Sequence, residues 1–210
     1  MDFYKTIADK AESSFIERKS EFIGYLCPAQ TEQQAIGFIS EVRAKHRKAT
    51  HNVYAYILRE QNITRYSDDG EPQGTAGVPV LDILQKEGLY DICCVVTRYF
   101  GGIMLGAGGL VRAYSHGAKL AIESAQILHM RLCNTIRIEV EYHLYDRISH
   151  EFALPTLGVR VLDTVFTENV TITLLVSVDG CDALIKTLTE VTNGQISLDI
   201  INELYADLPL

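Results

Sequence analysis

Apolar and polar residues alternate with a clear period in the last third of the chain. Ile136, Ile138 and Val140 fall on one face of a period-two segment, which is the pattern of a strand with one buried face. A helical pattern and two strand patterns follow, and Asn193 with Gly194 ends a second helical pattern. The predicted elements are strand 135–142, helix 144–154, strands 158–167 and 169–179, helix 182–191 and strand 195–204.

The order β-α-β-β-α-β predicts a ferredoxin-like domain with both helices on one face of an antiparallel sheet. The preceding part of the chain also predicts an α+β domain. Its elements are strand 21–27, helix 30–45, a hairpin of 52–58 with 63–66, a short helix opened by Pro79, strand 91–98 and helix 110–125. Strand 91–98 is a continuous apolar run, so we expect it to be covered on both faces.

Charge divides the chain at the same place. Residues 1–134 carry 15 Lys and Arg against 15 Asp and Glu, whereas residues 135–210 carry 4 against 12, so the net charge of −8 lies in the last third. We therefore predict two domains, 1–132 and 135–210. The acidic C-terminal domain is not expected to bind nucleic acid alone, because a phosphate backbone requires compensating cations.

Several protein classes are not favoured by the sequence. It has no apolar run long enough for a membrane span and no secretory signal pattern near its start, so we expect a cytoplasmic protein without a membrane partner. The five cysteines have no zinc-type spacing and are read as small hydrophobic residues in a reducing compartment. No metal or cofactor is predicted.

The most unusual segment lies between Tyr66 and Arg112, where two glycine-rich tracts carry acidic residues and arginines. Glycine loses much backbone entropy on folding, so its density indicates unusual backbone conformations or close approach to another group. We expect the two tracts to face each other and to form one binding surface. Its candidate residues are Asp68, Asp69, Glu71, Gly74, Thr75, Gly77, Arg98, Tyr99, Phe100, Gly101, Gly102, Gly106, Gly108, Gly109 and Arg112.

The second tract leads into a helix at Gly108 and Gly109, where free amides and the helix dipole could hold an anion. Its pattern, GGIMLGAGG, is neither a dinucleotide fingerprint nor a P-loop. A backbone surface for a polypeptide or an RNA phosphate therefore fits better than a nucleotide site. Tight packing of the loop on the helix explains the same glycines without a ligand.

Charged residues of the tracts suggest an internal ion pair. Arg112 in the first helical turn is expected to pair with Asp68, Asp69 or Glu71, with an external anion as the alternative. The tract SDDGEP resembles a calcium loop only superficially, because it lacks the EF-hand spacing. A turn whose aspartates cap nearby amides is the simpler interpretation.

A catalytic arrangement can be assembled from His51, Asp68 and either Ser67 or Thr75, but no local motif supports it. A hydrolase or transferase acting on a phosphate or peptide substrate at this surface is therefore kept as the alternative function. The one basic cluster, which includes His46, is either a solvated helix end or a contact for RNA or an acidic partner. It comprises Arg43, Lys45, His46, Arg47 and Lys48.

Four blocks of the sequence resemble the signature blocks of the Impact family in its bacterial, YigZ-type form. They are KSEFIGYLCPA, KATHNVYAY, RYSDDGEPQGTAGVPVLDIL and VVTRYFGGIMLGAGGLVRAYSHGAK, and they cover most of residues 19–119. The resemblance implies a ribosomal-protein domain-2-like α/β sandwich followed by a domain similar to domain five of elongation factor G. Eukaryotic members regulate translation under starvation by competing for the ribosome-associated activator of an initiation-factor kinase, and this chain is expected to lack their extra N-terminal partner-binding domain.

Together, these patterns and the resemblance predict a non-enzymatic, translation-related protein. We expect its N-terminal domain to recognise a ribosome-associated protein or ribosomal RNA through the glycine-rich surface. Tyr99 or Phe100 would supply an aromatic anchor.

Overall fold

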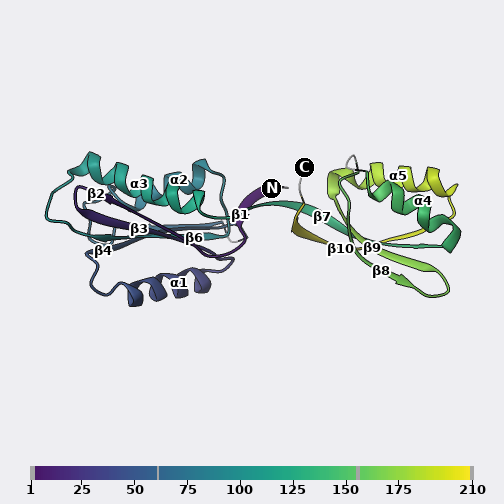
Figure 1. Cartoon of the computed structure of the whole chain (residues 1–210), viewed down its shortest axis with the longest axis horizontal. Coiled ribbons are helices and arrows are strands. Elements are labelled where there is room, and N and C mark those ends of the chain that lie inside the picture. Colours follow the sequence, from purple (N-terminus) through teal and green to yellow (C-terminus); the bar gives the residue numbers. More distant parts are fainter. Residues whose placement is uncertain (1–2, 61, 155–156, 209–210) are drawn as a thin grey trace. The chain divides into compact units, whose positions relative to one another are not determined.

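The computed structural model describes residues 3–60, 62–154 and 157–208 (Figure 1). These residues form two compact units, one from Tyr4 to Leu128 and one from His129 onward that also includes Phe3. The division falls inside a continuous strand, β7 (Ile127–Val140). Both units combine helices with a sheet, which confirms the predicted two-domain α+β class.

The N-terminal unit is built on a five-stranded sheet with the order β2-β3-β6-β4-β5, in which all neighbours are antiparallel. The strands are β2 (Ala11–Glu17), β3 (Ser20–Pro28), β4 (His51–Leu58), β5 (Ile63–Ser67) and β6 (Ile92–Tyr99). The first helix, α1 (Glu32–Lys45), covers one face of the sheet. The other face is covered by α2 (Gly77–Lys86) and α3 (Ala107–Glu123) (Figure 1).

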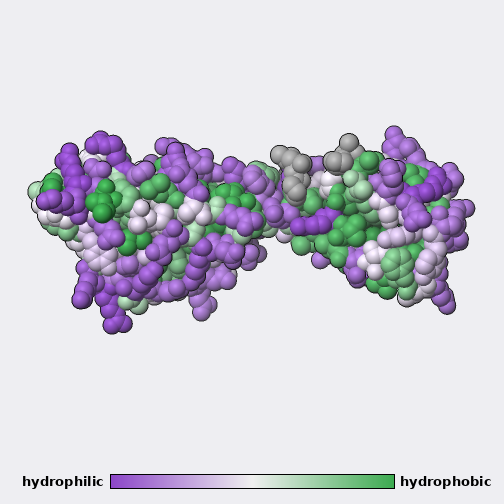
Figure 2. Space-filling view, viewed as in Figure 1, coloured by the Kyte–Doolittle hydropathy of each residue, from purple (hydrophilic) through white to green (hydrophobic). Residues whose placement is uncertain are grey.

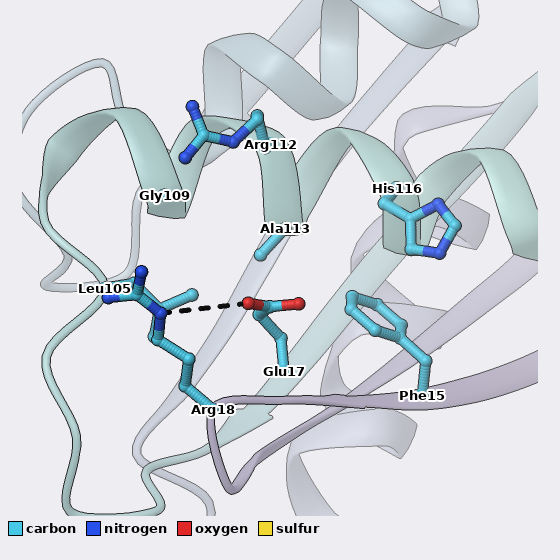
Figure 3. Close-up of a pocket in the computed structure, with 8 residues that line it drawn as sticks. All are labelled: Phe15, Glu17, Arg18, Leu105, Gly109, Arg112, Ala113 and His116. Atoms are coloured by element: carbon cyan, nitrogen blue, oxygen red, sulfur yellow. Dashed lines mark ion pairs between the residues drawn. The ribbon is translucent and has the colours of Figure 1, made fainter.

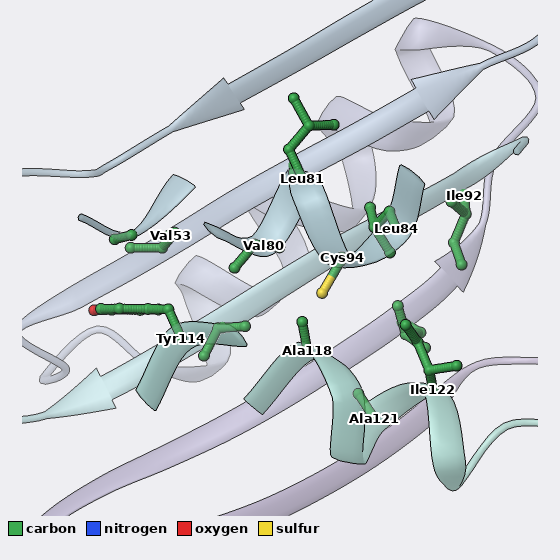
Figure 4. Close-up of a cluster of buried hydrophobic side chains, with 14 of the residues drawn as sticks. Val53, Val80, Leu81, Leu84, Ile92, Cys94, Tyr114, Ala118, Ala121 and Ile122 are labelled. Carbon is green, nitrogen blue, oxygen red and sulfur yellow. The ribbon is translucent and has the colours of Figure 1, made fainter. Parts of the chain in front are cut away.

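A separate apolar core lies on each face of this sheet. Under α2 and α3, Tyr114 and Ala118 of α3 and Leu84 of α2 pack over Cys94 of β6 (Figure 4). Under α1, Phe38 and other helix residues pack against the opposite side of the same strands. The central strand β6 is therefore buried on both faces, as its continuous apolar run predicts.

Alternation along β6 decides where its last residues lie. Because successive side chains of a strand point to opposite faces, Arg98 lies on the α3 side with Cys94, and Tyr99 lies on the α1 side with Cys93. Two adjacent candidate residues therefore end on different faces of the sheet.

The C-terminal unit contains β7, α4 (Tyr142–Phe152), β8 (Arg160–Phe166), β9 (Val170–Ser177), α5 (Cys181–Thr192) and β10 (Ser197–Asp207). A single 3-10 turn, Val178–Gly180, precedes α5. Strand β7 pairs antiparallel with β10 and with β9, and β9 pairs antiparallel with β8; β1 (Phe3–Ile7) also joins this sheet beside β7. Both helices lie on one face of the sheet (Figure 1). The ferredoxin-like β-α-β-β-α-β prediction is therefore confirmed.

The structure differs from the predicted elements most clearly at the start of the chain, at α2 and at β7. Two strands near the start of the chain, β1 (Phe3–Ile7) and β2, were not predicted, because their polar residues obscure the alternation. The start of α2 is Gly77 and not Pro79, because the Asp68 carboxylate accepts hydrogen bonds from the first amides of that helix. Strand β7 begins at Ile127, well before the predicted residue 135.

Candidate functional site

The two glycine-rich tracts meet at a buried ion pair. Nη1 of Arg98 lies 2.7 Å from Oε1 of Glu71, and the Tyr114 hydroxyl donates a hydrogen bond of 2.7 Å to the same oxygen. All three side chains are buried. The predicted contact between the tracts therefore exists, and a tyrosine of α3 joins it.

The surroundings of this pair are both polar and aromatic. The Arg98 guanidinium lies over the rings of Phe22 and Phe100, at 5.5 and 5.4 Å from their centroids, and its Nε is buried without a hydrogen-bond partner. Burial, followed by the adjacent Glu71 carboxylate, raises the pKa of Tyr114 far above its ordinary value. The tyrosine therefore stays protonated and acts as a hydrogen-bond donor.

Asp68 organises the first tract from within. Its Oδ1 accepts hydrogen bonds from the amides of Ala76 and Gly77 at 3.1 and 2.8 Å, and its Oδ2 accepts one from Gly74 at 2.9 Å. Thr75 closes the same turn by donating to the Pro72 carbonyl at 2.6 Å. The carboxylate is thus occupied by backbone donors, in agreement with the capping interpretation of SDDGEP.

Asp69 turns toward the other side of the sheet. Its Oδ1 forms an ion pair of 2.6 Å with Arg43 of α1, and its Oδ2 accepts the Asn52 amide at 2.6 Å. The His51 Nδ1 lies 2.8 Å from the Asp69 carbonyl, so this nitrogen carries the proton. The Nε2 of the same ring lies 3.8 Å from Oε2 of Glu71.

Gly101 permits a close approach between the second tract and the β2–β3 turn. A Cβ at this position would overlap the backbone carbonyl of Lys19, and the Gly101 amide donates to the Ser20 hydroxyl at 3.2 Å. Gly77 is restricted in the same way by the Ser67 backbone. These two glycines are therefore explained by packing, which the sequence left open as an alternative to ligand binding.

The segment from Phe100 to Gly108 is largely exposed and carries apolar side chains. Phe100, Ile103 and Met104 are 48%, 41% and 83% exposed. The loop then enters α3 at Ala107, and the N-cap residue, Gly106, has no side chain with which to cap the helix. Gly102, Gly106 and Gly108 are also exposed, whereas Gly109 packs against Leu105.

We call the exposed set Phe100, Ile103, Met104, Gly108 and Arg112 the loop surface. Figure 2 shows apolar patches among hydrophilic side chains at the end of the N-terminal domain where α3 begins. These residues come from the end of β6, the β6–α3 loop and the first turns of α3. The loop surface therefore combines apolar groups with a cation and the start of a helix, whose first amides have no partner within the helix.

Arg112 does not form the predicted internal ion pair. The carboxylates of Asp68, Asp69 and Glu71 bind other partners, and within the described part of the chain Arg112 forms no ion pair. It is exposed and lines a cavity of about 220 Å³ between α3 and the β2–β3 turn, together with Arg18 and Glu17 (Figure 3). Arg98, which is buried, forms the ion pair with Glu71 that we expected Arg112 to form.

Tyr99 does not belong to the surface either, because it faces α1. Its hydroxyl lies 2.9 Å from Nδ1 of His46, whose Nε2 is 2.6 Å from the Tyr25 hydroxyl. Burial, with a smaller effect of Lys45, lowers the pKa of His46. The ring is therefore a neutral link between two tyrosines, and among the residues that the structure describes no carboxylate bonds to it.

Only some of the side chains of the basic cluster are without an ion pair among the described residues. Arg43 is paired with Asp69, and Lys45 forms an ion pair of 3.0 Å with Glu12. Arg47 and Lys48 are exposed at the end of α1. The cluster therefore presents less uncompensated positive charge than its sequence indicates.

The remaining candidate chemistry is structural. Cys93 and Cys94 are buried, and burial raises the pKa of Cys94 to about 12. Among the described residues, no group of three or more His, Cys, Asp or Glu is arranged to hold a metal ion. In the same part of the chain, no helix has the length and apolar composition needed to cross a membrane.

Sequence reasoning missed three residues that shape the site: Ile103, Met104 and Tyr114. Helical spacing places Tyr114 on the buried face of α3 with Leu110 and Ala118, so periodicity could have identified it. The exposure of Ile103 and Met104 had no sequence signal, because isolated apolar residues usually pack inside.

Comparison with known proteins agrees with this architecture. Residues 18–122 match the Impact N-terminal domain, and residues 138–195 match a domain of unknown function (DUF1949). A solved structure described as "Crystal structure of an hypothetical protein" is similar with a TM-score of 0.60 at 28% identity, covering 96% of this chain and 98% of its own.

Curated bacterial proteins are similar to this chain, one of them over nearly its whole length. IMPACT family member YvyE of Bacillus subtilis is 37% identical over 193 residues, which are 91% of this chain and 88% of that protein. IMPACT family member YigZ of Escherichia coli is 38% identical over 129 residues, which are 60% of this chain and 63% of that protein. The chain therefore belongs to the IMPACT family and has the two-domain form of its bacterial members.

Proposed function

We propose that this protein is a non-enzymatic recognition module of the cytoplasm that binds a translation-related protein through the loop surface. The observation that carries the proposal is the exposure of Met104, at 83%, beside Phe100 and Ile103 on a loop with a fixed base. Clustered apolar side chains with polar neighbours on a surface mark interaction sites more often than isolated exposed residues do.

The base of the loop supports this role because it limits the entropy lost on binding. Arg98, Glu71 and Tyr114 form a buried, hydrogen-bonded group directly below Phe100, and Gly101 packs against the β2–β3 turn. A surface that is already ordered loses less conformational entropy when a partner binds. Phe100, Met104 and Arg112 are of residue types that are enriched at protein interfaces.

Protein fits the loop surface better than RNA as the partner. Residues 1–134 carry equal numbers of basic and acidic residues, and the cations at Arg43 and Lys45 are already paired with carboxylates. Binding to a phosphate backbone depends on uncompensated cations. The link to translation rests on the family resemblance.

An enzymatic role has less support from the geometry. His51, Glu71 and Tyr114 lie near one another, with His51 Nε2 at 3.8 Å from Glu71 Oε2. However, Glu71 and Tyr114 are buried, so a substrate would not reach them without opening of the domain. The group instead supports the loop from below.

Ribosome co-sedimentation of the full chain tests the proposal. We expect Met104→Asp and Phe100→Ala to lower the fraction of protein that sediments with ribosomes. Ile36→Asp is a matched control, because Ile36 is 53% exposed on α1, which covers the other face of the sheet. Equal sedimentation of all three variants and the unmodified protein would contradict the proposal. It would also be contradicted if only a rise in salt concentration, and none of the substitutions, lowered the association, with the steep salt dependence that is typical of RNA binding.

A further inference from the structure

We propose that β2 accepts an extended peptide that carries an acidic side chain, by addition of the peptide as a new strand at this edge of the sheet. This inference goes beyond the loop surface, because its main-chain contacts lie on β2; the two surfaces share Arg112, but the β2 edge can bind a peptide even if Phe100, Ile103 and Met104 bind nothing. Peptide addition to a sheet edge uses main-chain hydrogen bonds for affinity and flanking pockets for specificity.

The first observation is that β2 is a regular, uncovered edge. It pairs with β3 through seven consecutive residues without a register shift, and it ends the sheet order β2-β3-β6-β4-β5. The opposite edge, β5, has only five residues. In the C-terminal sheet, β8 and β10 each contain a register shift. Short strands and bulges protect edges from unwanted pairing, and β2 has neither feature.

The register of β2 shows which backbone groups are free. The two-residue turn at Arg18 and Lys19 has positive φ at both positions and closes on the pair Glu17 and Ser20. Hydrogen-bonded and non-hydrogen-bonded pairs alternate from that closing pair in an antiparallel ladder. The N–H and C=O groups of Glu12, Ser14 and Ile16 therefore point away from β3 toward solvent.

A cavity flanks β2 on each face of the sheet. On the α3 side, the cavity of about 220 Å³ is lined by Phe15, Leu105 and Arg112 among others (Figure 3). On the α1 side, a cavity of about 200 Å³ is lined by Glu12 and Phe38 among others. Successive side chains of an added strand would enter these two cavities alternately.

The charges in the two cavities differ. On the α3 side, Arg18, Arg112 and Glu17 line the cavity, so two guanidinium groups share it with one carboxylate, and the Arg18–Glu17 contact is long, at 4.0 Å. His116 lines the same cavity with its ring edge-on to Phe15 at 4.7 Å. A carboxylate from a ligand would compensate the excess positive charge in this cavity.

On the α1 side, the cations are already compensated. Lys10 pairs with Glu41 at 2.7 Å, and Lys45 pairs with Glu12 at 3.0 Å. Ile16, which is 73% exposed, lies on this side of β2 and offers an apolar contact to a cross-strand neighbour. The ligand is therefore an extended segment with an acidic side chain toward α3 and uncharged side chains toward α1.

A second copy of β2 satisfies this chemistry less well. In the antiparallel register centred on Ser14, the partner strand would place its Ala11 and Ser13 opposite Glu17 and Phe15. Neither residue supplies a carboxylate to the Arg112 cavity. This register pairs all seven residues of β2, and in it charge complementarity favours an acidic peptide over self-association.

The test uses the full, isotopically labelled chain and blocked peptides of alternating threonine and valine with Glu, Gln or Lys at the centre. We expect the Glu peptide to slow amide hydrogen exchange at Glu12, Ser14 and Ile16, while Ser13 and Phe15, already bonded to β3, stay unchanged. We also expect it to bind about tenfold more tightly than the Lys peptide, the scale of one hydrogen bond to a charged group.

Two pairs of variants separate the backbone from the charge. Ser14→Pro removes one outward N–H at an edge position and should abolish the protection, whereas Ser14→Ala should retain it. Arg112→Gln leaves the backbone of β2 intact and should remove the preference for Glu over Lys. Arg65→Gln, on the opposite edge strand β5, is its matched control and should not change the preference.

Three outcomes would overturn the inference. The first is unchanged exchange at Glu12, Ser14 and Ile16 at saturating concentrations of the Glu peptide. The second is protection that rises with protein concentration alone and is lost in Ser14→Pro, which would assign the edge to a second copy. The third is protection of the same amides by single-stranded oligouridylate and not by the peptides, which would assign the edge to RNA.

Discussion

The Arg98 guanidinium and the Glu71 carboxylate lie 2.7 Å apart inside the N-terminal domain, with only 6% and 4% of their side chains exposed. This contact joins the acidic tract to the strand that precedes the glycine-rich loop. The Tyr114 hydroxyl adds a bond from α3 to the same carboxylate. Three segments distant in sequence therefore depend on one carboxylate for their relative positions.

Removal of that carboxylate should destabilise the protein strongly. Glu71→Ala leaves Arg98 buried without its counter-charge and Tyr114 without an acceptor, which should cost about 3–5 kcal/mol in the free energy of unfolding. Urea denaturation followed by circular dichroism measures this change. The double variant Glu71→Leu/Arg98→Leu removes both charges and should recover part of the loss. A cost below about 1 kcal/mol for Glu71→Ala would mean that the pair is solvated.

Addition of one methyl group at Gly101 should disturb the packing of the loop on the β2–β3 turn. In Gly101→Ala the new Cβ would overlap the Lys19 carbonyl, so we expect a loss of about 1–3 kcal/mol. Gly37→Ala is the control, because Gly37 is exposed within α1 with open space around it. That change should stabilise the protein by about 0.5–1 kcal/mol. Equal melting temperatures for the two variants would contradict the packing explanation.

Asp68 should act as a backbone cap and not as a metal ligand. Asp68→Ala removes acceptors from the amides of Gly74, Ala76 and Gly77, and should lower the free energy of unfolding by about 1–3 kcal/mol. Because the carboxylate is already occupied, millimolar calcium or a chelator should leave the melting temperature of the unmodified protein unchanged. A rise in melting temperature with calcium that disappears in Asp68→Ala would show that the carboxylate binds metal.

His46 should make stability fall as the pH becomes acidic. Burial lowers its folded-state pKa below the ordinary value of 6.5, so the unfolded chain binds the proton first. Its stabilising contribution is therefore complete above about pH 6.5 and declines below it, by at most about 1.4 kcal/mol per pH unit. Denaturation midpoints across this range should show the slope in the unmodified protein and a smaller slope in His46→Gln. An identical slope in both would assign the pH dependence to other groups.

Most of the fold follows from periodicity. The alternating residues of β7 and β9 and the helical spacing of α5 predicted the ferredoxin-like domain, because one buried face imposes a strict pattern on each element. The continuous apolar run at β6 predicted a strand that is covered on both faces. By contrast, β2 lies at an edge and reads AESSFIE, so its half-exposed residues gave no clear signal.

The site was less predictable because its contacts are not local. The sequence indicated that acidic residues of one tract contact arginines of the other, but it did not show which arginine is buried. In the structure the Glu71 carboxylate pairs with Arg98 and not with Arg112. The alternation of side chains along β6 predicts that Arg98 and Tyr99 lie on opposite faces of the sheet, which explains why Tyr99 does not join the contact between the tracts. The role of Asp68 at the start of α2 depends on a turn that brings Gly77 back to it, which no pattern within that helix reveals.

The central claim is that the loop surface recognises a protein of the translation machinery. A photo-crosslinking amino acid placed at Met104 in the full chain, in cells, tests it most directly, with the same amino acid at Ile36 as the control. We predict crosslinks from position 104, and not from position 36, to a ribosomal or ribosome-associated protein. Crosslinks from position 104 that are absent, shared with position 36, or directed to RNA would contradict the claim.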